Sequence, residues 1–301
     1  MKRLYFICNL HSGKAAISNY LGKIINRFTE SNYEVVVHPT QYSGDGIESA
    51  KYACQNNFDL IVCSGGDGTL NEVIQGCMLS SNKISIGYIP NGSTNDFARG
   101  IGIPISPMEA VENILNGKPL FCDVGSFNEK YFTYIAAFGA FTEISYQTPQ
   151  QYKNVLGHAA YILSGIARLP HIKATRMRIE YDNIVLEDNY LYGMVTNSTS
   201  VANLLSLSDV EWDDGLFEVT LIKKPTNLLH FQKIISSLAN GLQLESEKQY
   251  IDYFRASNIK VTNLEDDDVA WTIDGEYGGN KRVNEIKNHH KAISFLMDMD
   301  T

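Results

Sequence analysis

The sequence predicts two domains: an α/β domain over residues 1–121, built on a parallel sheet flanked by helices, and an antiparallel β-sandwich over residues 122–301. The length of 301 residues exceeds that of most single domains. Strand-like and helix-like segments alternate as far as about residue 121, which is typical of a parallel sheet covered by helices. Beyond that point the apolar pattern changes to short alternating runs, which favour antiparallel sheet.

In the first domain, four expected strands alternate with four expected helices. The strands cover residues 2–8, 33–38, 58–63 and 84–89, and the helices cover residues 17–30, 46–55, 70–78 and 107–116. Ligands of such sheets bind in the crevice beyond the carboxyl ends of the strands. Thr40 and the loops at 9–14, 64–71 and 90–99 therefore form the expected binding edge.

In the second domain, alternating apolar runs predict strands at residues 130–134, 176–181, 190–196, 216–222, 258–262 and 269–273. Two helix-like segments, residues 152–169 and 228–242, interrupt them. No internal repeat or low-complexity linker marks the domain boundary, so it is defined only by the change of pattern near Phe121.

Composition and charge argue against several classes of protein. The formal net charge of −9 argues against nucleic acid as a partner. No segment reaches the roughly 18 consecutive apolar residues of a membrane span, and the apolar run at the N-terminus stops at Asn9, too early for a signal peptide. The five cysteines form no Cys-x-x-Cys pair, which favours buried thiols in a reducing compartment. We therefore expect a cytoplasmic globular protein.

The most informative segment is the glycine-rich turn at residues 64–71, which reads Ser-Gly-Gly-Asp-Gly-Thr-Leu-Asn. Its glycines let the backbone turn sharply and approach a ligand closely, where a strand leads into a helix. The free amides of a helix N-terminus bind phosphate, and Asp67 can help to hold the metal ion or the nucleotide. The segment matches neither the Walker A loop nor the dinucleotide fingerprint, which would require glycine at Asn71. A polyphosphate site is the favoured interpretation.

Two further loops offer polar groups to the same edge. Residues 91–99 read Asn-Gly-Ser-Thr-Asn-Asp-Phe-Ala-Arg, and such side chains bind phosphate oxygens, ribose or a hydrated Mg²⁺. The same residue types also suit a plain turn followed by a helix N-cap. In the loop at 9–14, Asn9, Ser12 and Gly13 could cradle the same nucleotide.

Two carboxylates in the second domain flank a glycine, in the segment Asp274-Gly275-Glu276. Acids at positions i and i+2 of an extended chain share a face. A carboxylate placed there can accept the proton of a substrate hydroxyl that attacks the terminal phosphate of ATP. A hairpin Asp-Gly turn with incidental acids is the alternative.

A second acidic turn precedes the expected strand at 216–222. Glu211, Asp214 and a backbone carbonyl near Leu216 could ligate a hard cation through oxygen. A turn without a metal ion is the alternative.

Two basic clusters stand out against the acidic background and could attract a phosphate-rich membrane surface. The first comprises Arg168, His171, Lys173, Arg176 and Arg178, and the second comprises Lys281, Arg282, Lys287 and Lys291. A solvated basic face is the alternative for both.

Taken in order, these motifs resemble those of the diacylglycerol kinase catalytic-domain family, and in particular of its soluble bacterial lipid kinases. The resemblance rests on the glycine-rich turn, the Asn-Asp-Phe-Ala-Arg loop, Asp-Asp-Gly-Leu-Phe at 213–217 and Ile-Asp-Gly-Glu at 273–276. With Leu-Gly-His-Ala-Ala-Tyr at 156–161 it covers nearly the whole chain. It implies a nucleotide-binding α/β domain like that of NAD kinases, followed by a β-sandwich lipid domain, with ATP between them.

The resemblance also implies roles for individual residues. Asp67 and Asp96 would lie near the phosphates and Mg²⁺, Asp274 or Glu276 would be the general base, and Glu211, Asp214 and the Leu216 carbonyl would hold a second, structural Mg²⁺. Two departures are present: Ser93 replaces the usual threonine, and residues 199–203 lack a glycine pair, which puts the identity of the lipid in doubt. The residues implied to bind ATP are Asn9, Ser12, Gly13, Thr40, Gly65, Gly66, Asp67, Gly68, Thr69, Asn71, Ser93 and Asp96.

The sequence is thus interpreted as an ATP- and Mg²⁺-dependent lipid kinase that acts at the inner face of the membrane by reversible, peripheral association. Diacylglycerol is the leading acceptor and phosphatidic acid the product. NAD kinase, which shares the glycine-aspartate turn, is one alternative. A nucleotide-sensing or membrane-docking protein that has lost catalysis is another, although the acids at 67, 96, 274 and 276 speak against it. A homodimer is left open.

Overall fold

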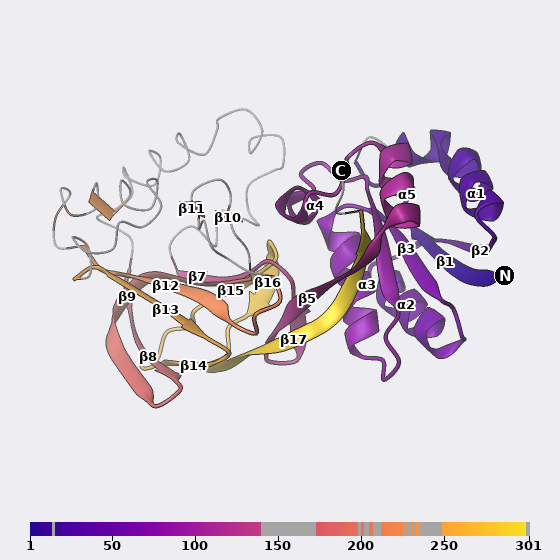
Figure 1. Ribbon diagram of the computed structural model, residues 1–301. Coiled ribbons are helices and arrows are strands. Elements are labelled where there is room, and N and C mark those ends of the chain that lie inside the picture. Colours follow the sequence, from indigo (N-terminus) through magenta and orange to yellow (C-terminus); the bar gives the residue numbers. More distant parts are fainter. Residues whose placement is uncertain are drawn as a thin grey trace. The chain divides into compact units, whose positions relative to one another are not determined.

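The computed structural model describes residues 1–13, 16–139, 173–197, 200–201, 205–206, 212–225, 227, 230, 233–234 and 249–298 (Figure 1). The chain divides into two compact units, one formed by Met1–Val124 with His290–Thr301 and the other by Gly125–His289. Two strands cross from one unit to the other: β5 (Lys118–Phe127) and β17 (Val283–Met297).

The first unit is built on a parallel sheet. Its strands are β1 (Lys2–Cys8), β2 (Tyr33–Pro39), β3 (Leu60–Gly65) and β4 (Ser85–Pro90), which follow the order β4-β3-β1-β2, and the last part of β17 pairs with β4. Every pair runs parallel, including Phe295 of β17 beside Ile86 of β4. The inner strand β3 is buried along its whole length, because helices cover both faces of the sheet.

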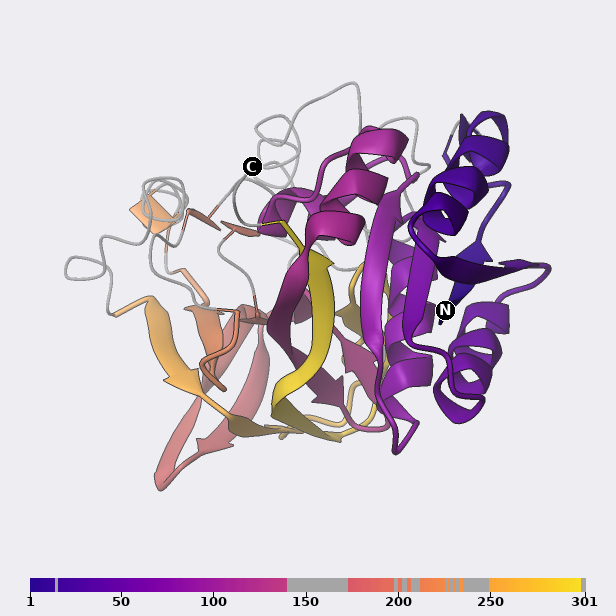
Figure 2. The same cartoon turned by 45° about the vertical axis from the view of Figure 1, so that its right-hand side comes forward.

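Two pairs of helices form the outer layers of this unit, on opposite faces of the sheet (Figure 2). The first pair comprises α1 (Leu21–Glu30) and α5 (Pro107–Asn116), and the second comprises α2 (Asp45–Gln55) and α3 (Asp67–Met78). A 3₁₀ helix η1 (Ala16–Asn19) precedes α1, and the short helix α4 (Asp96–Ile101) follows β4. Ile24 and Phe28 lie one turn apart on α1, so both enter the core beside Leu4 and Phe6 of β1.

The second unit is an antiparallel β structure. Its strands follow the order β16-β15-β7-β9-β8-β14-β17, while β12 pairs with β9 and β13, and β5 pairs with β6. Within the described residues they are β6 (Lys130–Phe132), β7 (Ile135–Gly139), β8 (Thr175–Tyr181), β9 (Ile184–Thr196), β10 (Ser200–Val201), β11 (Leu205–Ser206), β12 (Phe217–Lys223), β13 (Ile251–Ala256), β14 (Asn258–Asn263), β15 (Trp271–Ile273) and β16 (Glu276–Gly279).

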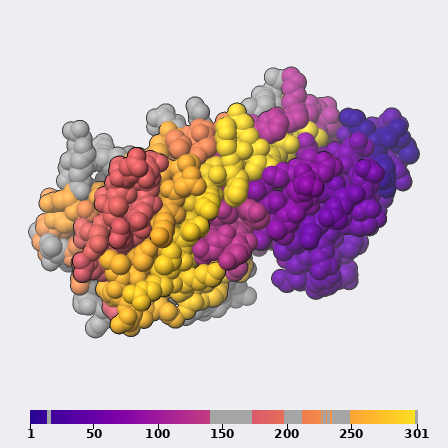
Figure 3. Space-filling model, turned by 90° about the horizontal axis from the view of Figure 1, so that it is seen from below, coloured from indigo at the N-terminus to yellow at the C-terminus, as the bar shows by residue number. Residues whose placement is uncertain are grey.

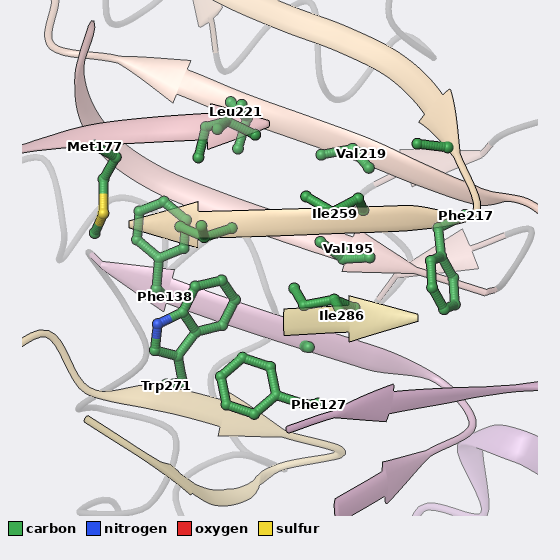
Figure 4. Close-up of a cluster of buried hydrophobic side chains, with 14 of the residues drawn as sticks. Phe127, Phe138, Met177, Val195, Phe217, Val219, Leu221, Ile259, Trp271 and Ile286 are labelled. Carbon is green, nitrogen blue, oxygen red and sulfur yellow. The ribbon is translucent and has the colours of Figure 1, made fainter. Parts of the chain in front are cut away.

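Trp271 of β15 belongs to the second unit's core and lies beside Phe127 and Phe138 (Figure 4). Its ring lies 4.8 Å from that of Phe127 and 4.8 Å from that of Phe138, measured between centroids. Phe217 stacks on Phe132 in the same core, with 5.5 Å between the ring centroids. Alternate residues of β12, namely Phe217, Val219 and Leu221, supply apolar side chains to this core.

The predicted fold class is confirmed, with a parallel α/β unit and an antiparallel β unit. The four strands expected in the first domain are β1 to β4. Seven strands of the described residues had no counterpart in the predictions: β5, β7, β10, β11, β13, β16 and β17. The helix expected at 152–169 lies outside the described residues, as does most of the one expected at 228–242.

Two further properties follow from the described residues. All five cysteines are buried and free, as the sequence suggested. Among the helices that the structure describes, none has the length and apolar character needed to span a bilayer.

Candidate active site

The first unit holds a cavity of about 460 Å³ at the carboxyl ends of β1, β2 and β3. Its size suits a small-molecule ligand. Six of the predicted nucleotide contacts line it, namely Asn9, Ser12, Thr40, Gly66, Gly68 and Thr69. His11, which belongs to the predicted loop at 9–14, lines it too, and four further lining residues were not singled out from the sequence: Gln41, Tyr42, Ser43 and Glu72.

The glycine-rich turn leads directly from β3 into α3, as expected, although the helix starts at Asp67 and not at Leu70. Gly66 is the N-cap residue and is extended, with φ −87° and ψ −176°. Its carbonyl accepts the first helical hydrogen bond from the Leu70 N–H at 3.1 Å. Because a glycine N-cap has no side chain to bond the first amides of α3, these amides can meet an anion in the cavity.

Two glycines bring the loops after β3 and β4 into contact. A Cβ added to Gly92 would lie 2.5 Å from the Cα of Gly66, closer than real atoms approach. Gly13, which has φ +56°, likewise lies against the backbone carbonyl of Asn91. The sequence therefore uses glycine at these positions so that three loops can pack backbone against backbone.

Gly68 is different, because the position of its missing Cβ lies in open space. The protein's own packing therefore does not require glycine there, although Gly68 lines the cavity. A ligand that approaches the backbone of α3 closely would explain the residue. This observation fits the triphosphate of a nucleotide.

Hydrogen bonds link the three loops. The Asn9 N–H donates to Ser64 O at 2.8 Å, and the Asn9 Nδ2 donates to Thr69 Oγ1 at 3.2 Å. Ser12 Oγ donates to Asn91 O at 3.0 Å. The Thr40 N–H donates to Cys8 O at 3.0 Å and so places Thr40 beside the first loop. The structure thus brings together the loops that the sequence placed at one edge.

Asp67 and Asp96 begin α3 and α4 respectively, and Asp67 links the two helices. Its Oδ2 accepts the hydroxyl of Thr94 at 3.1 Å and its Oδ1 accepts the Phe97 N–H at 3.3 Å. The carboxylate is thereby held next to Asp96, and the two acids offer the oxygen ligands that Mg²⁺ prefers. Neither of them lines the cavity, and nor do four other predicted contacts: Gly13, Gly65, Asn71 and Ser93.

The loop at residues 40–46 was missed by the sequence analysis beyond Thr40, and two carboxylates hold it. Glu72 of α3 accepts the N–H of Gly44 at 2.7 Å and that of Gly46 at 3.0 Å. Asp45 accepts the N–H of Gln41 at 2.7 Å. Burial of Asp45 opposes its ionisation, but this bond and the one with His38 at 2.8 Å outweigh burial and lower the pKa of Asp45.

In the second unit, Asp274 and Gly275 form the turn of the β15–β16 hairpin. Both have positive φ, +47° and +88°, as the two central residues of a type I′ turn require. The expectation that residues 274–276 form an extended chain with both acids on one face is therefore wrong. The Asp274 carboxylate accepts the N–H groups of Thr133, Tyr134 and Ile135 at 2.9, 3.0 and 2.9 Å. The Glu276 side chain is exposed.

Of the three expected ligands for a second metal ion, Glu211 lies outside the described residues. Asp214 accepts the Leu216 N–H at 2.8 Å through Oδ1 and the guanidinium of Arg255 through Oδ2. Arg255 also pairs with the buried Glu218 at 3.2 Å. Burial raises the pKa of Glu218 to about 7, although Arg255 opposes this. Arg255 thus supplies a positive charge at this turn.

The basic clusters are largely neutralised by neighbouring acids. Arg168 and His171 lie outside the described residues. Most of the remaining cations lie in exposed ion pairs, which contribute little to stability but reduce the local positive charge. These pairs are Lys173–Glu265, Lys173–Asp267, Arg176–Glu187, Arg178–Glu180, Lys281–Glu129 and Lys287–Glu285. Apolar side chains are exposed nearby, on the β8–β9 hairpin at Ile184 and Val185, and this hairpin is visible at the surface in Figure 3.

Comparison with known proteins places this geometry in a family. Residues 3–127 match the diacylglycerol kinase catalytic domain, and residues 140–293 match the YegS C-terminal NAD kinase beta sandwich-like domain. The chain is 36% identical over 299 residues to a protein of Bacillus subtilis (strain 168) named diacylglycerol kinase, with 99% of this chain and 97% of that protein covered.

A protein of the same name from Staphylococcus saprophyticus is 34% identical over 296 residues, with 97% and 95% of the two chains covered. A crystal structure described as a diacylglycerol kinase from Bacillus anthracis str. Sterne has the same fold, with a TM-score of 0.76 at 21% identity over 99% of this chain and 97% of that one. The resemblance inferred from the motifs is confirmed: this chain belongs to the diacylglycerol kinase catalytic-domain family.

Proposed function

We propose that this protein is an ATP-dependent diacylglycerol kinase, which transfers the γ-phosphoryl group of ATP to the free hydroxyl of diacylglycerol and forms phosphatidic acid. The observation that carries the proposal is the cavity at the start of α3. Gly68 lines this cavity, although no neighbouring atom of the protein would prevent a side chain there. Nearly full-length relatives named diacylglycerol kinase support the choice of acceptor.

The nucleotide would bind to the first unit. The backbone amides at Gly68 and Thr69 would donate to phosphate oxygens, assisted by the positive end of α3. Asn9, Ser12 and Thr40 would hold the rest of the nucleotide, since all three residues line the cavity. These groups are held in place by their own hydrogen bonds before the ligand arrives, so little ordering is left to be done on binding.

Asp67 and Asp96 would bind Mg²⁺ that accompanies the phosphates. Their carboxylates begin adjacent helices, and Asp67 is kept in place by the hydrogen bonds that it accepts from Thr94 and Phe97. When bound, Mg²⁺ would neutralise part of the negative charge on the phosphates.

Between the two candidate bases, we propose Glu276 as the proton acceptor and Asp274 as the residue that fixes the hairpin. The oxygens of Asp274 already accept three backbone N–H groups, whereas the Glu276 carboxylate is exposed and can approach a hydroxyl. The lipid hydroxyl oxygen would attack the γ-phosphorus as its proton passes to Glu276. The bond between that phosphorus and the oxygen bridging to ADP would break, and ADP would leave.

Because the acceptor is a lipid, the protein would meet it at a membrane surface by reversible association. The ion pairs of the basic clusters make simple attraction of those cations to anionic lipid a weak explanation. The exposed Ile184 and Val185 give an apolar alternative within the described residues. Co-sedimentation with liposomes that contain either no anionic lipid or a high fraction of it distinguishes the two mechanisms. Only attraction of the basic clusters depends on lipid charge, whereas insertion of apolar side chains does not.

The proposed function is tested by transfer of label from γ-labelled ATP to diacylglycerol in mixed micelles, with Mg²⁺ and then with EDTA, and with NAD offered in a parallel reaction. We expect Mg²⁺-dependent labelled phosphatidic acid and unlabelled NAD. Labelled NADP would contradict the proposal and establish a NAD kinase. Binding of ATP with no transfer to any lipid alcohol would indicate a nucleotide-binding protein without catalysis.

A further inference from the structure

One aromatic side chain of the cavity has no explanation in the packing of the protein. Tyr42 lines the cavity, yet 59% of its surface is exposed. Tyr52 is similarly exposed at 51%, but its ring lies 5.6 Å from that of Tyr5 and contributes to an aromatic cluster near the C-terminal end of α2. An exposed ring at the rim of a ligand cavity points to a function in binding.

The Tyr42 ring is held in one orientation. Its hydroxyl donates to Glu48 Oε2 at 2.9 Å, one turn into α2. The backbone on both sides of it is also fixed, because Asp45 accepts the Gln41 N–H and Glu72 accepts the Gly44 N–H, both at 2.7 Å. A flat apolar surface that is already ordered can bind a planar ligand without a large cost in side-chain entropy.

The sheet order places this ring at a useful distance from the phosphate-binding turn. The loop with Tyr42 follows β2 and the glycine-rich turn follows β3, with β1 between these two strands. Neighbouring strands are about 4.8 Å apart, so the two loops begin roughly 10 Å from each other. A nucleotide with its phosphates at α3 can therefore reach the β2 loop with its base.

We propose that Tyr42 is the stacking platform for the base of the nucleotide, and that it gives the site a preference for purine over pyrimidine triphosphates. This inference rests on the proposed function, and names how its nucleotide is recognised. The larger π surface of a purine covers more of a tyrosine ring than a pyrimidine does. Tyr42 would thus contribute to affinity and base selectivity, and not to the transfer step.

The test measures binding of three probes to the full chain without lipid: ATP, CTP and inorganic tripolyphosphate. Removal of a stacking aromatic typically weakens binding by roughly tenfold or more. We expect Tyr42→Ala to bind ATP about tenfold or more weakly than the wild type, and its affinities for ATP and CTP to differ less than those of the wild type. Its affinity for tripolyphosphate should be unchanged. Tyr42→Phe keeps the ring but loses the Glu48 hydrogen bond, and we expect it to stay within about threefold of the wild type.

Tyr52→Ala is the matched control, since it removes an equally exposed tyrosine outside the cavity and should leave ATP binding unchanged. In the kinase reaction, Tyr42→Ala should raise KM for ATP and leave kcat unchanged. Unaltered ATP binding by Tyr42→Ala would overturn the inference, and so would an equal loss for tripolyphosphate, which would mean that the loop had collapsed. A wild-type chain that binds no ATP would overturn the proposed function and this inference together. Normal stacking without lipid phosphorylation would overturn the proposed function alone.

Discussion

Gly66 and Gly92 face each other so closely that a Cβ on Gly92 would lie 2.5 Å from the Cα of Gly66. The loops after β3 and β4 are therefore joined through their backbones, with no side chain between them. This contact, together with the bond between the Asn91 N–H and Gly65 O at 2.8 Å, sets the position of the turn that begins α3.

Substitution by alanine should have opposite effects on protein stability at two glycines of the site. Gly92→Ala meets backbone, so we expect a loss of about 1–3 kcal/mol in the free energy of unfolding. Gly68→Ala meets open space within α3, where alanine favours the helix by about 0.4–1 kcal/mol, so we expect equal or greater stability. Its methyl group would nevertheless enter the space proposed for phosphate and weaken ATP binding.

Thermal unfolding of both variants and their ATP affinities test this separation. A Gly68→Ala chain that binds ATP like the wild type would contradict the close approach of a ligand to α3. Gly22→Ala, at another helix position with no atom near its Cβ, is the control for the general effect of alanine on helix stability.

Substitution of the two carboxylates of the β15–β16 hairpin should affect different properties, stability for Asp274 and turnover for Glu276. Asp274→Asn places an amide group opposite three backbone N–H donors, so at least one of them loses its acceptor, at a cost of about 1–3 kcal/mol in stability. Glu276→Gln changes an exposed side chain and should leave the unfolding free energy within about 0.5 kcal/mol of the wild type. If Glu276 accepts the proton, kcat should fall roughly 100-fold or more in this variant.

Paired measurement of unfolding and of kcat at saturating substrates distinguishes these outcomes. A stable Asp274→Asn variant without activity, beside a fully active Glu276→Gln, would assign the base to Asp274 instead.

The strands that could be predicted from the sequence are those whose burial leaves a recognisable pattern of apolar residues along the chain. Strands β1 and β3 are buried on both faces, so they form continuous apolar runs that need no knowledge of their neighbours. β17 could not be recognised in this way, because an asparagine takes one of the buried positions in its first half, where the alternation would require an apolar residue. This residue is Asn284, whose side chain accepts a hydrogen bond from Asn128 and donates one to the carbonyl of Lys281. Asn128 is far away in the sequence, so the pairing cannot be read from β17 alone.

The candidate site shows the same division. The glycine-rich turn carries its own signal, because glycine at a strand-to-helix junction has few other uses. The loop with Tyr42 carries none, since Gln-Tyr-Ser-Gly-Asp at 41–45 reads as an ordinary polar turn. Its order depends on Glu72, which is near it only after α2 and α3 have packed together. Asp274 was found as an acid, but its binding to the amides at 133–135 depends on strand pairing.

Asp67 should govern the requirement for Mg²⁺. Asp67 accepts hydrogen bonds from Thr94 and from the Phe97 N–H through two different oxygens. Asp67→Asn has only one carbonyl oxygen, so it can keep only part of this bonding, and it loses the negative charge that favours Mg²⁺. We expect a lower kcat and a higher Mg²⁺ concentration for half-maximal activity, with the unfolding temperature little changed. Glu109→Gln removes an acid from the first turn of another helix, α5, and should leave the Mg²⁺ titration unaltered. An unchanged Mg²⁺ titration in Asp67→Asn would exclude Asp67 from the metal site.

The lowered pKa of Asp45 should appear in the acid unfolding of the protein. Its ordinary pKa is 3.8, and in the folded state the value lies below that, because bonds from the Gln41 N–H and His38 outweigh its burial. The unfolded chain therefore takes up this proton at a higher pH than the folded one. The stabilisation is present above about pH 4 and is lost as pH falls through the folded pKa.

Asp45→Asn removes this contribution, so the variant should unfold more easily than the wild type near pH 7, and the difference should narrow below about pH 4. Because Asp45 also fixes the backbone before Tyr42, ATP affinity should fall in the same variant under neutral conditions. Denaturant unfolding across this pH range measures the first effect and titration with ATP the second. A difference in stability that stays constant from neutral to acid pH would show that ionisation of Asp45 does not stabilise the fold, even if the loop still needs its side chain.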